Sequence, residues 1–259
     1  WGWCRQQGRD PREMPLIIES LNLWREMSAR IQQDVGFNEC GVLALAQSDT
    51  DLEKHRDWSS LGQEYGVESK LLGGTEVAQY IPGCATVWTG GLYTPSDGRA
   101  EPTLAAPAIA LAARRLGAKI FTNTAVRTID TQAGRVNGVV TEHGRIRCNT
   151  VIVAAGAWTS PFLRNLGIRL PQLKVRSSAF RTHPLPGGPE VSIYASGFAV
   201  RKRADGGYTI ALGGRTRIPY DLTPDSFRHV RDFLSLAWMS RKSLRLRLSG
   251  RFLTEQRYA

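Results

Sequence analysis

Apolar residues recur at helical spacing in two long stretches of the chain, residues 15–35 and 103–117. In the first stretch the apolar positions are Leu16, Ile17, Leu21, Trp24, Met27 and Ile31. Residues three or four apart share one face of a helix, so this spacing predicts an amphipathic helix. Pro15 suits its first turn and Gly36 is expected to end it. The second stretch is rich in Ala and Leu, with Pro107 expected near its first turn and Gly117 as the C-cap.

Shorter helices are predicted elsewhere from capping residues and from breaks at proline and glycine. Residues 49–66 read as an exposed helix capped by Asp49 or Thr50. Further helices are expected over residues 75–83, 159–167 and 223–238.

Strands are predicted where short apolar or alternating runs lie between turn residues. A buried strand is expected over 40–48, a strand and loop over 90–102, and a meander within 118–156 that turns at Ala133-Gly134 and His143-Gly144. After Pro171 the predicted strands are 173–183, 190–196, 197–203 and 207–214. Helix–strand alternation is thus interleaved with a sheet-rich region, which predicts two intertwined lobes.

The stretch CNTVIVAAGAWTS, residues 148–160, combines a buried strand with a small-residue end. Val151-Ile152-Val153 leads into Ala154-Ala155-Gly156, and a helix start follows Trp158. Small residues let another group approach the backbone closely. These residues alone fit a bound ligand and a tight strand-to-helix crossover equally well.

Composition and charge narrow the class of protein. Of 259 residues, 42% are hydrophobic, and no apolar run approaches the ~20 residues that span a bilayer. The net charge is +11, with five basic residues and no acid over 241–251. Leu244, Leu246 and Leu248 alternate there with arginine, which predicts a half-buried strand with a charged face and disfavours nucleic-acid binding.

Cysteine and histidine give no metal or redox motif. The cysteines are Cys4, Cys40, Cys84 and Cys148, far apart and without a C-x-x-C pair. The histidines, in no ligand spacing, are His55, His143, His183 and His229. Neither a disulfide framework nor a metal site is implied, and a reducing, cytoplasmic setting is expected.

The order of motifs over residues 90–170 resembles the D-amino-acid oxidase-type flavoenzymes, the group that includes glycine oxidase, sarcosine oxidase and bacterial D-amino-acid dehydrogenase. The matching elements are helix 103–117 ending RRLGAKIF, the segment TNTAVRTID, the meander, and the strand ending AAGAW. The resemblance is looser over the rest of the chain. It implies an α/β fold with interleaved α+β elements: part of an FAD-binding Rossmann-like lobe plus an antiparallel-sheet substrate lobe.

The resemblance implies FAD as the cofactor and assigns it contacts. Val126 takes the position under the adenine, and Ala154, Ala155, Gly156 and Trp158 take the strand end that meets the dinucleotide. Trp1, Gly2 and Trp3 fall where the family has a loop passing the isoalloxazine. An aromatic cluster at the edge of a core is the alternative for the two tryptophans.

The other positions that match the family give weaker assignments of residue roles. Asp97, Arg99 and Glu101 are expected to be turn and helix-cap residues. Hairpin 197–214 resembles the family's substrate-lobe hairpin, which makes Phe198 and Arg201 candidate substrate contacts. Phe198 stands where the family often has Tyr, and Arg201 where Pro is common, so both departures weaken the assignment.

One family motif is absent from the 259 residues. No G-x-G-x-x-G phosphate loop occurs, the first residue is not Met, and the polar start has no signal-peptide core. We therefore expect an internal fragment of a longer enzyme. The expected segments are 1–36 and 91–170 for the FAD lobe, and 37–90 and 171–259 for the substrate lobe.

The implied reaction is oxidation of a C–N bond in an amino acid or secondary amine, with hydride passing to flavin N5. The expected partners are a small-molecule amine or amino-acid substrate and an electron acceptor or second subunit. No catalytic residue is assigned, and the fragment alone is expected to be inactive. The alternatives are a related flavoprotein acting on a hydroxy acid, an opine or a modified tRNA base, and a non-enzymatic basic nucleic-acid-binding module.

Overall fold

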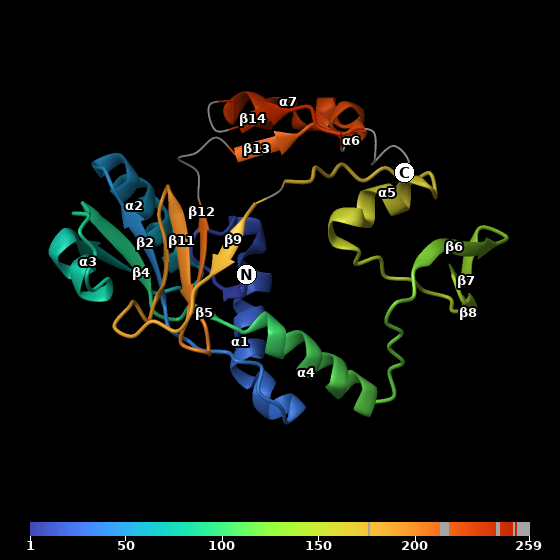
Figure 1. The fold of residues 1–259 in the computed structure, drawn as a ribbon, viewed down its shortest axis with the longest axis horizontal. Helices are drawn as coiled ribbons and strands as arrows, with labels where there is room; N and C mark the ends of the chain where they lie inside the picture. Colours follow the sequence, from blue (N-terminus) through green and yellow to red (C-terminus); the bar gives the residue numbers. More distant parts are fainter. Residues whose placement is uncertain (176, 213–217, 242–243, 251, 253–259) are drawn as a thin grey trace. The chain divides into compact units, whose positions relative to one another are not determined.

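The computed structural model describes residues 1–175, 177–212, 218–241, 244–250 and 252. The chain forms two compact units, each built from two separate stretches (Figure 1). Trp1–Lys119 and Ser177–Thr216 make up the first unit, and Ile120–Arg176 and Arg217–Ala259 the second. The interleaved mixture of α and β elements predicted from the sequence is confirmed.

A seven-stranded mixed sheet is the centre of the first unit. Its strand order is β3-β4-β2-β10-β11-β12-β9. The bounds are Lys70–Gly73 for β3, Gly90–Thr94 for β4, Val42–Ala46 for β2, Ser192–Tyr194 for β10, Phe198–Lys202 for β11, Tyr208–Leu212 for β12 and Ala179–Arg181 for β9. Only the β2–β10 pair is parallel, and it joins the strands after Pro171 to the earlier ones. The sheet is therefore mixed where an antiparallel sheet was expected.

Helices cover both faces of the β4 end of this sheet. A Cβ at Gly90 would meet a side-chain carbon of Leu52 in α2, Asp49–Glu64, at 3.0 Å. A Cβ at Gly91 would meet Val77 of α3, Gly74–Tyr80, at 3.3 Å. Because neighbouring strand residues point to opposite faces, α2 and α3 lie on opposite sides of the sheet.

The largest apolar core of the first unit lies between the sheet and α3. The buried members are Leu43, Leu45, Leu72, Val77, Ile81, Trp88, Val191 and Ile193. Every residue of the central strand β2 is buried, which confirms the buried strand predicted over 40–48.

Two further helices of the first unit are α1, Met14–Ile31, and α4, Pro102–Arg115. Val35, Ala105 and Ala108 form a second core, on which Trp24 of α1 packs. The predicted stop at Gly36 is wrong, because Gln32 already adopts a left-handed φ of 53° and its N–H bonds to the carbonyl of Ala29. A short 3-10 turn, Pro11–Glu13, precedes α1.

A two-stranded clip connects the start of the chain to the loop before α4. Strand β1, Trp3–Cys4, pairs antiparallel with β5, Gly98–Arg99. This pairing brings the first residues of the chain beside residues that follow them by nearly a hundred positions.

The second unit contains the predicted meander. Its strands are β6, Val126–Gln132, β7, Arg135–Thr141, and β8, Gly144–Arg147, all antiparallel. The remaining elements are a 3-10 turn, Gly156–Trp158, α5, Thr159–Arg164, α6, Pro224–Arg228, α7, Val230–Met239, and the parallel strands β13, Ile218–Asp221, and β14, Leu244–Arg247.

Three predictions in the second unit need correction. Residues 151–155 lie in no strand, because nothing in the described chain pairs with them, and Ile152 is 88% exposed. The helix predicted over 223–238 is divided at His229 into α6 and α7. Strand β14 forms as predicted, yet Leu246 and Leu248 are exposed, so it is not half-buried.

Across the ranges that the structure describes, no helix is both long and apolar enough to cross a membrane.

Candidate functional site

A cavity of about 680 Å³ in the second unit brings together most of the predicted cofactor residues. It is lined by the start of β6, the extended segment 151–155 and α5. Val126, Ala154, Ala155 and Trp158 all line it. Gly156 directly follows the last lining residue of the extended segment. Residues separated by thirty positions in sequence thus face one space.

The turn after this segment is held by a side chain that sequence analysis did not single out. Gln172 donates from Nε2 to the carbonyl of Gly156 at 3.1 Å, and its Oε1 accepts from the N–H of Ser160 at 3.3 Å. Lys174 places its ammonium 4.2 Å from the ring centroid of Trp158. Lys174 comes from the stretch 173–183 that was predicted as a strand, and Gln172 lies just before it, so only the folded chain shows their role.

The small residues at this turn are not required by packing within the described chain. Ala154, Ala155 and Gly156 are all exposed. A Cβ built on Gly156 meets nothing within 4 Å, although its φ of 53° disfavours other residues. The left-handed φ accounts for the glycine, and the cofactor role of Ala154, Ala155 and Gly156 stays a prediction.

The first residues of the chain form an aromatic and cationic cluster in the first unit. Trp1 and Trp3 meet edge to face at 5.3 Å, and Trp3 lies 5.8 Å from Tyr194 of β10. The guanidinium carbon of Arg5 lies 5.5 Å from the Trp3 ring and 5.3 Å from the Tyr194 ring. Burial raises the pKa of the Tyr194 hydroxyl, so this group stays neutral.

Gly2 is needed for the close fit of this segment. Its φ is 92°, and its carbonyl accepts from the N–H of Ala100 at 2.8 Å. A Cβ at Gly2 would lie 2.3 Å from the carbonyl oxygen of Ala100. The glycine is thus explained by contacts inside the chain, whereas the cofactor role of Trp1, Gly2 and Trp3 stays a prediction.

Asp97 fixes the following residues of the same segment. It is fully buried, and its two carboxylate oxygens accept from the N–H groups of Gln6 and Gln7 at 2.7 and 3.0 Å. Burial raises the pKa of Asp97, while these hydrogen bonds oppose the rise. Asp97 therefore holds a segment ninety residues away.

Glu101 and Arg201 form a buried ion pair. Arg201 donates from Nη1 to Oε1 of Glu101 at 2.7 Å, and the N–H of Ala204 donates to the same oxygen at 3.0 Å. Glu101 does occupy the N-cap position of α4, but its side chain makes no capping hydrogen bond. The prediction of a cap role for its side chain is therefore wrong.

The two candidate substrate residues lie on opposite faces of β11. Phe198 packs against the core and lies 6.1 Å from Trp88, ring to ring. Arg201, three positions further, points to the face that carries Tyr194 and is committed to Glu101. The structure does not bring these two side chains to one site.

Cysteine and histidine contribute little chemistry in the described ranges. Burial raises the pKa of the Cys4 thiol to about 11, so it is protonated at neutral pH and is a poor nucleophile. All four cysteines are free. No group of three or more His, Cys, Asp or Glu side chains in the described part of the chain is arranged to hold a metal ion.

The cavity of the second unit has the size and the mainly apolar lining of a small-molecule or cofactor site. Comparison with known proteins identifies the group. The family model described as FAD dependent oxidoreductase matches residues 1–241, and the chain belongs to that family.

Curated relatives include enzymes that are named for amine and amino-acid oxidation. Human mitochondrial sarcosine dehydrogenase is 29% identical over 217 residues, which are 80% of this chain and 23% of the relative. D-amino acid dehydrogenase of Bradyrhizobium diazoefficiens is 28% identical over 213 residues, 80% of this chain and 49% of the relative. The chain thus spans half or less of these curated relatives.

A solved structure confirms the fold. L-amino acid deaminase from Proteus myxofaciens, in complex with anthranilate, has a TM-score of 0.86 and 28% identity. The similarity covers 96% of this chain and 56% of that one.

Proposed function

We propose that the protein containing this chain uses FAD to oxidise the C–N bond of an amino acid or a secondary amine. Family membership supports FAD, and the names of the relatives support this substrate class. The observation that carries the proposal is the exposed group of small residues, 154–156, at the end of the extended segment beside the cavity of the second unit.

The residues present fit part of such a cofactor. Ala154, Ala155 and Gly156 would let the dinucleotide approach the backbone, with Val126 beside the adenine and Trp158 across the cavity. Gln172 would keep the turn in place through its two hydrogen bonds. The phosphate-binding glycine loop is not among the 259 residues. Bound FAD supplies the two-electron oxidation, and the protein positions it and the substrate.

Trp1, Gly2 and Trp3 would contribute a second contact, near the isoalloxazine ring. Their support is the rigid packing of the segment: the β1–β5 clip, the Gly2–Ala100 hydrogen bond and the Asp97 contacts hold it in one conformation. A fixed backbone suits a site that must orient a flat ring.

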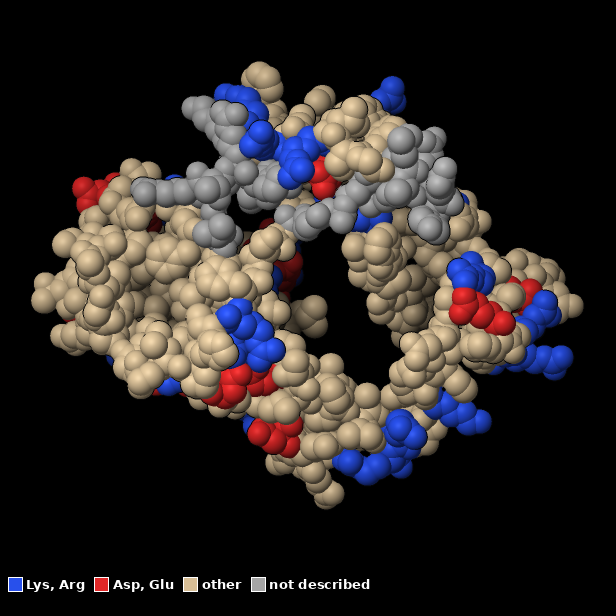
Figure 2. Space-filling model, in the orientation of Figure 1, with Lys and Arg blue, Asp and Glu red and all other residues tan. Residues whose placement is uncertain are grey.

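We further propose a cytoplasmic location and an electron acceptor or second subunit that reoxidises the flavin. Four free cysteines support a reducing compartment. The comparisons do not favour the nucleic-acid alternative, and the β6–β8 sheet carries no purely basic stretch on the face shown in Figure 2. Over the β6–β8 sheet, basic and acidic side chains lie side by side (Figure 2), with Arg127 paired to Glu142 and Arg145 3.4 Å from Asp130.

The first test is a flavin spectrum of the full-length protein, followed by a substrate panel under anaerobic conditions. We expect bleaching of the flavin by amino acids or N-methyl amino acids, and none by the matching 2-hydroxy acids. Bleaching by hydroxy acids alone would reject the proposed substrate class and leave FAD binding intact.

The second test is Gly156→Val in the full-length protein, beside Gly156→Ala. Both variants strain the left-handed backbone, at a cost of roughly 1–2 kcal/mol, but valine adds two methyl groups beyond the Cβ at the end of the extended segment. We expect flavin absorbance per polypeptide to fall far more for valine than for alanine, while the melting temperatures of the two apoproteins stay close. Arg245→Ala, in the exposed strand β14, should leave flavin content unchanged. A Gly156→Val protein that keeps its full flavin content would show that the cavity of the second unit is not the cofactor site.

A further inference from the structure

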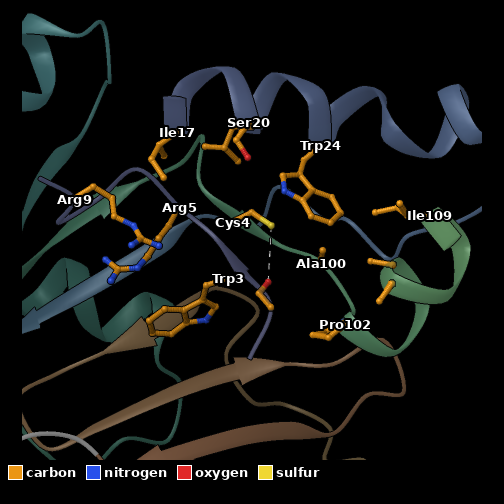
Figure 3. A pocket seen from close by; sticks show the side chains of 14 residues that line it. Trp3, Cys4, Arg5, Arg9, Ile17, Ser20, Trp24, Ala100, Pro102 and Ile109 are labelled. Carbon is orange, nitrogen blue, oxygen red and sulfur yellow. Dashed lines mark hydrogen bonds between the residues drawn. The ribbon is translucent and has the colours of Figure 1, made fainter. Parts of the chain in front are cut away.

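A pocket of about 200 Å³ lies in the second unit, between α5 and the junction of α6 with α7. It shares no lining residue with the larger cavity of the same unit, which meets α5 at Pro161 and Phe162. It is also distinct from the cavity of the first unit shown in Figure 3, which Trp3 borders and which belongs with the proposed isoalloxazine contacts. Sites for drug-sized ligands usually measure roughly 300 Å³ or more, so this pocket suits a small ion or one end of a ligand.

The polar wall of this pocket is mainly basic. Arg164 comes from α5, Arg169 from the segment that follows it, and Arg228 and His229 from the end of α6. Ser160 adds a hydroxyl group. Among the described residues, no aspartate or glutamate lines the pocket. The wall therefore favours an anion.

Two carboxylates outside the wall hold the basic groups in place. Oδ1 of Asp225 accepts from Nη1 of Arg164 at 2.6 Å and from Nη1 of Arg228 at 3.1 Å. Oδ2 of Asp232 accepts from Arg169 and lies 3.6 Å from Nδ1 of His229. Each carboxylate is thus shared by two basic groups, so neither neutralises both of its partners.

Several donors of the wall remain available after these contacts. Within the described ranges, Arg228 bonds only through Nη1 and Arg169 only through Nη2, although a guanidinium carries five N–H groups. His229 is 6% exposed, and its Nδ1 is buried without a hydrogen-bond partner in the same ranges. The pocket therefore combines fixed positive charge with unused donors.

We propose that this pocket binds a phosphate dianion, either inorganic phosphate or the end of a small phosphomonoester. Guanidinium groups present paired N–H donors that match phosphate oxygens. The oxygens of phosphate point in different directions, so they reach donors from α5 and from the end of α6 together, whereas the two oxygens of a carboxylate lie in one plane. Asp225 and Asp232 hold the arginines in the required orientation. The proposal goes beyond the flavin chemistry, because binding is measured without turnover.

The test is titration calorimetry of the full-length protein at constant ionic strength, with inorganic phosphate, methyl phosphate and acetate as probes. The measurement is made at about pH 8, where phosphate is a dianion. We expect inorganic phosphate to bind at least roughly tenfold more tightly than acetate. Methyl phosphate that binds like inorganic phosphate would identify a phosphomonoester as a ligand, and weaker binding would assign the site to inorganic phosphate. Equal binding of phosphate and acetate would overturn the proposal.

Variants locate the bound phosphate. Arg169→Gln and Arg228→Gln should each weaken phosphate binding by roughly tenfold. Both side chains are largely exposed, at 60% and 46%, so the fold should be kept, and melting temperatures without phosphate check this. Arg231→Gln is the matched control, because Arg231 is exposed on α7 and does not line the pocket. An equal loss in all three variants would show that only net charge matters and would contradict the proposal.

Flavin absorbance recorded during the phosphate titration separates this pocket from the cofactor site, since FAD also carries phosphate groups. We expect no release of flavin, because the pocket and the cavity proposed for the cofactor have no lining residue in common. Release of flavin in step with phosphate binding would show that both occupy one site, and would overturn the proposal even if the arginine variants fail to fold. A protein that contains no flavin would reject the proposed function but leave the phosphate titration valid.

Discussion

Single buried residues decide how the start of the chain is held. Glu101, Arg201 and Asp97 are charged and nearly inaccessible, which is uncommon unless each has a partner. The sequence predicted turn and helix-cap roles for Asp97 and Glu101, because charged residues beside glycine and proline usually have those roles, and a substrate contact for Arg201. The long-range pair Glu101–Arg201 could not be predicted, since nothing local links positions a hundred residues apart.

Replacing Glu101 with glutamine should destabilise the protein strongly. Arg201 would keep its buried charge without a carboxylate, a situation that costs about 3–5 kcal/mol in comparable sites. Chemical denaturation of Glu101→Gln measures the loss. Glu190→Gln is the control, because Glu190 pairs with Lys202 at an exposed position and should change stability by less than ~1 kcal/mol. Similar losses of stability in both variants would show that burial does not increase the contribution of the Glu101–Arg201 pair to stability.

Cys4 should make stability fall at alkaline pH. Its pKa is about 11 when folded, against an ordinary value of 9.0. The folded state therefore holds the proton more tightly, and this contribution is complete below about pH 9 and is lost as the pH rises toward 11. The difference in unfolding free energy between the unmodified protein and Cys4→Ala should shrink over that window. A difference that is constant with pH would show that the thiol does not titrate in this way.

Local sequence patterns predicted the helices and strands, but they did not predict the residues at which these elements end. Helix α1, strand β2 and the β6–β8 meander were predicted because their periodicity and turn residues agree. The end of α1 at Gln32 and the break at His229 depend on backbone conformations that glutamine and histidine do not signal. The extended segment 151–155 was predicted as a strand from its composition, but a strand also needs a partner to pair with.

The start of α2 offers a direct test of capping. Ser48, not Asp49 or Thr50, is the N-cap, and its Oγ accepts from the N–H of Asp51 at 3.3 Å. Ser48→Ala should cost about 1 kcal/mol of stability. Thr50→Ala lies within the first turn and should cost little, so denaturation curves of the two variants identify the cap. A larger loss for Thr50→Ala would reverse the assignment.

At the scale of the whole molecule, the family was accessible from sequence, whereas the cofactor role of the residues in the second unit stays a prediction. Val126 and the 154–158 segment carry motifs whose order is specific, and the structure places four of these residues around one cavity. Gln172, Lys174 and Tyr194 were missed because their contacts depend on the fold. The assignment of the four segments to FAD and substrate lobes stays a prediction, since compact units alone do not say what each binds.

The 259-residue chain by itself should bind FAD weakly. A glycine-rich loop at a helix start supplies N–H groups to the pyrophosphate, and this chain contains no such motif. Equilibrium dialysis of residues 1–259 beside the full-length protein checks the prediction. Micromolar or tighter binding by residues 1–259 would show that the cavity of the second unit suffices without the phosphate loop.

The parallel pairing of β2 with β10 affects when the sheet can form during synthesis of the chain. Ala44 in the centre of the first unit pairs with Tyr194, and the intervening residues must leave the ribosome first. At about 5–20 residues per second, one edge of this wholly apolar strand stays unpaired for on the order of ten seconds. An open apolar edge invites pairing with other nascent chains. Strand β2 is therefore a segment of the newborn polypeptide that a chaperone would protect from aggregation until β10 is made.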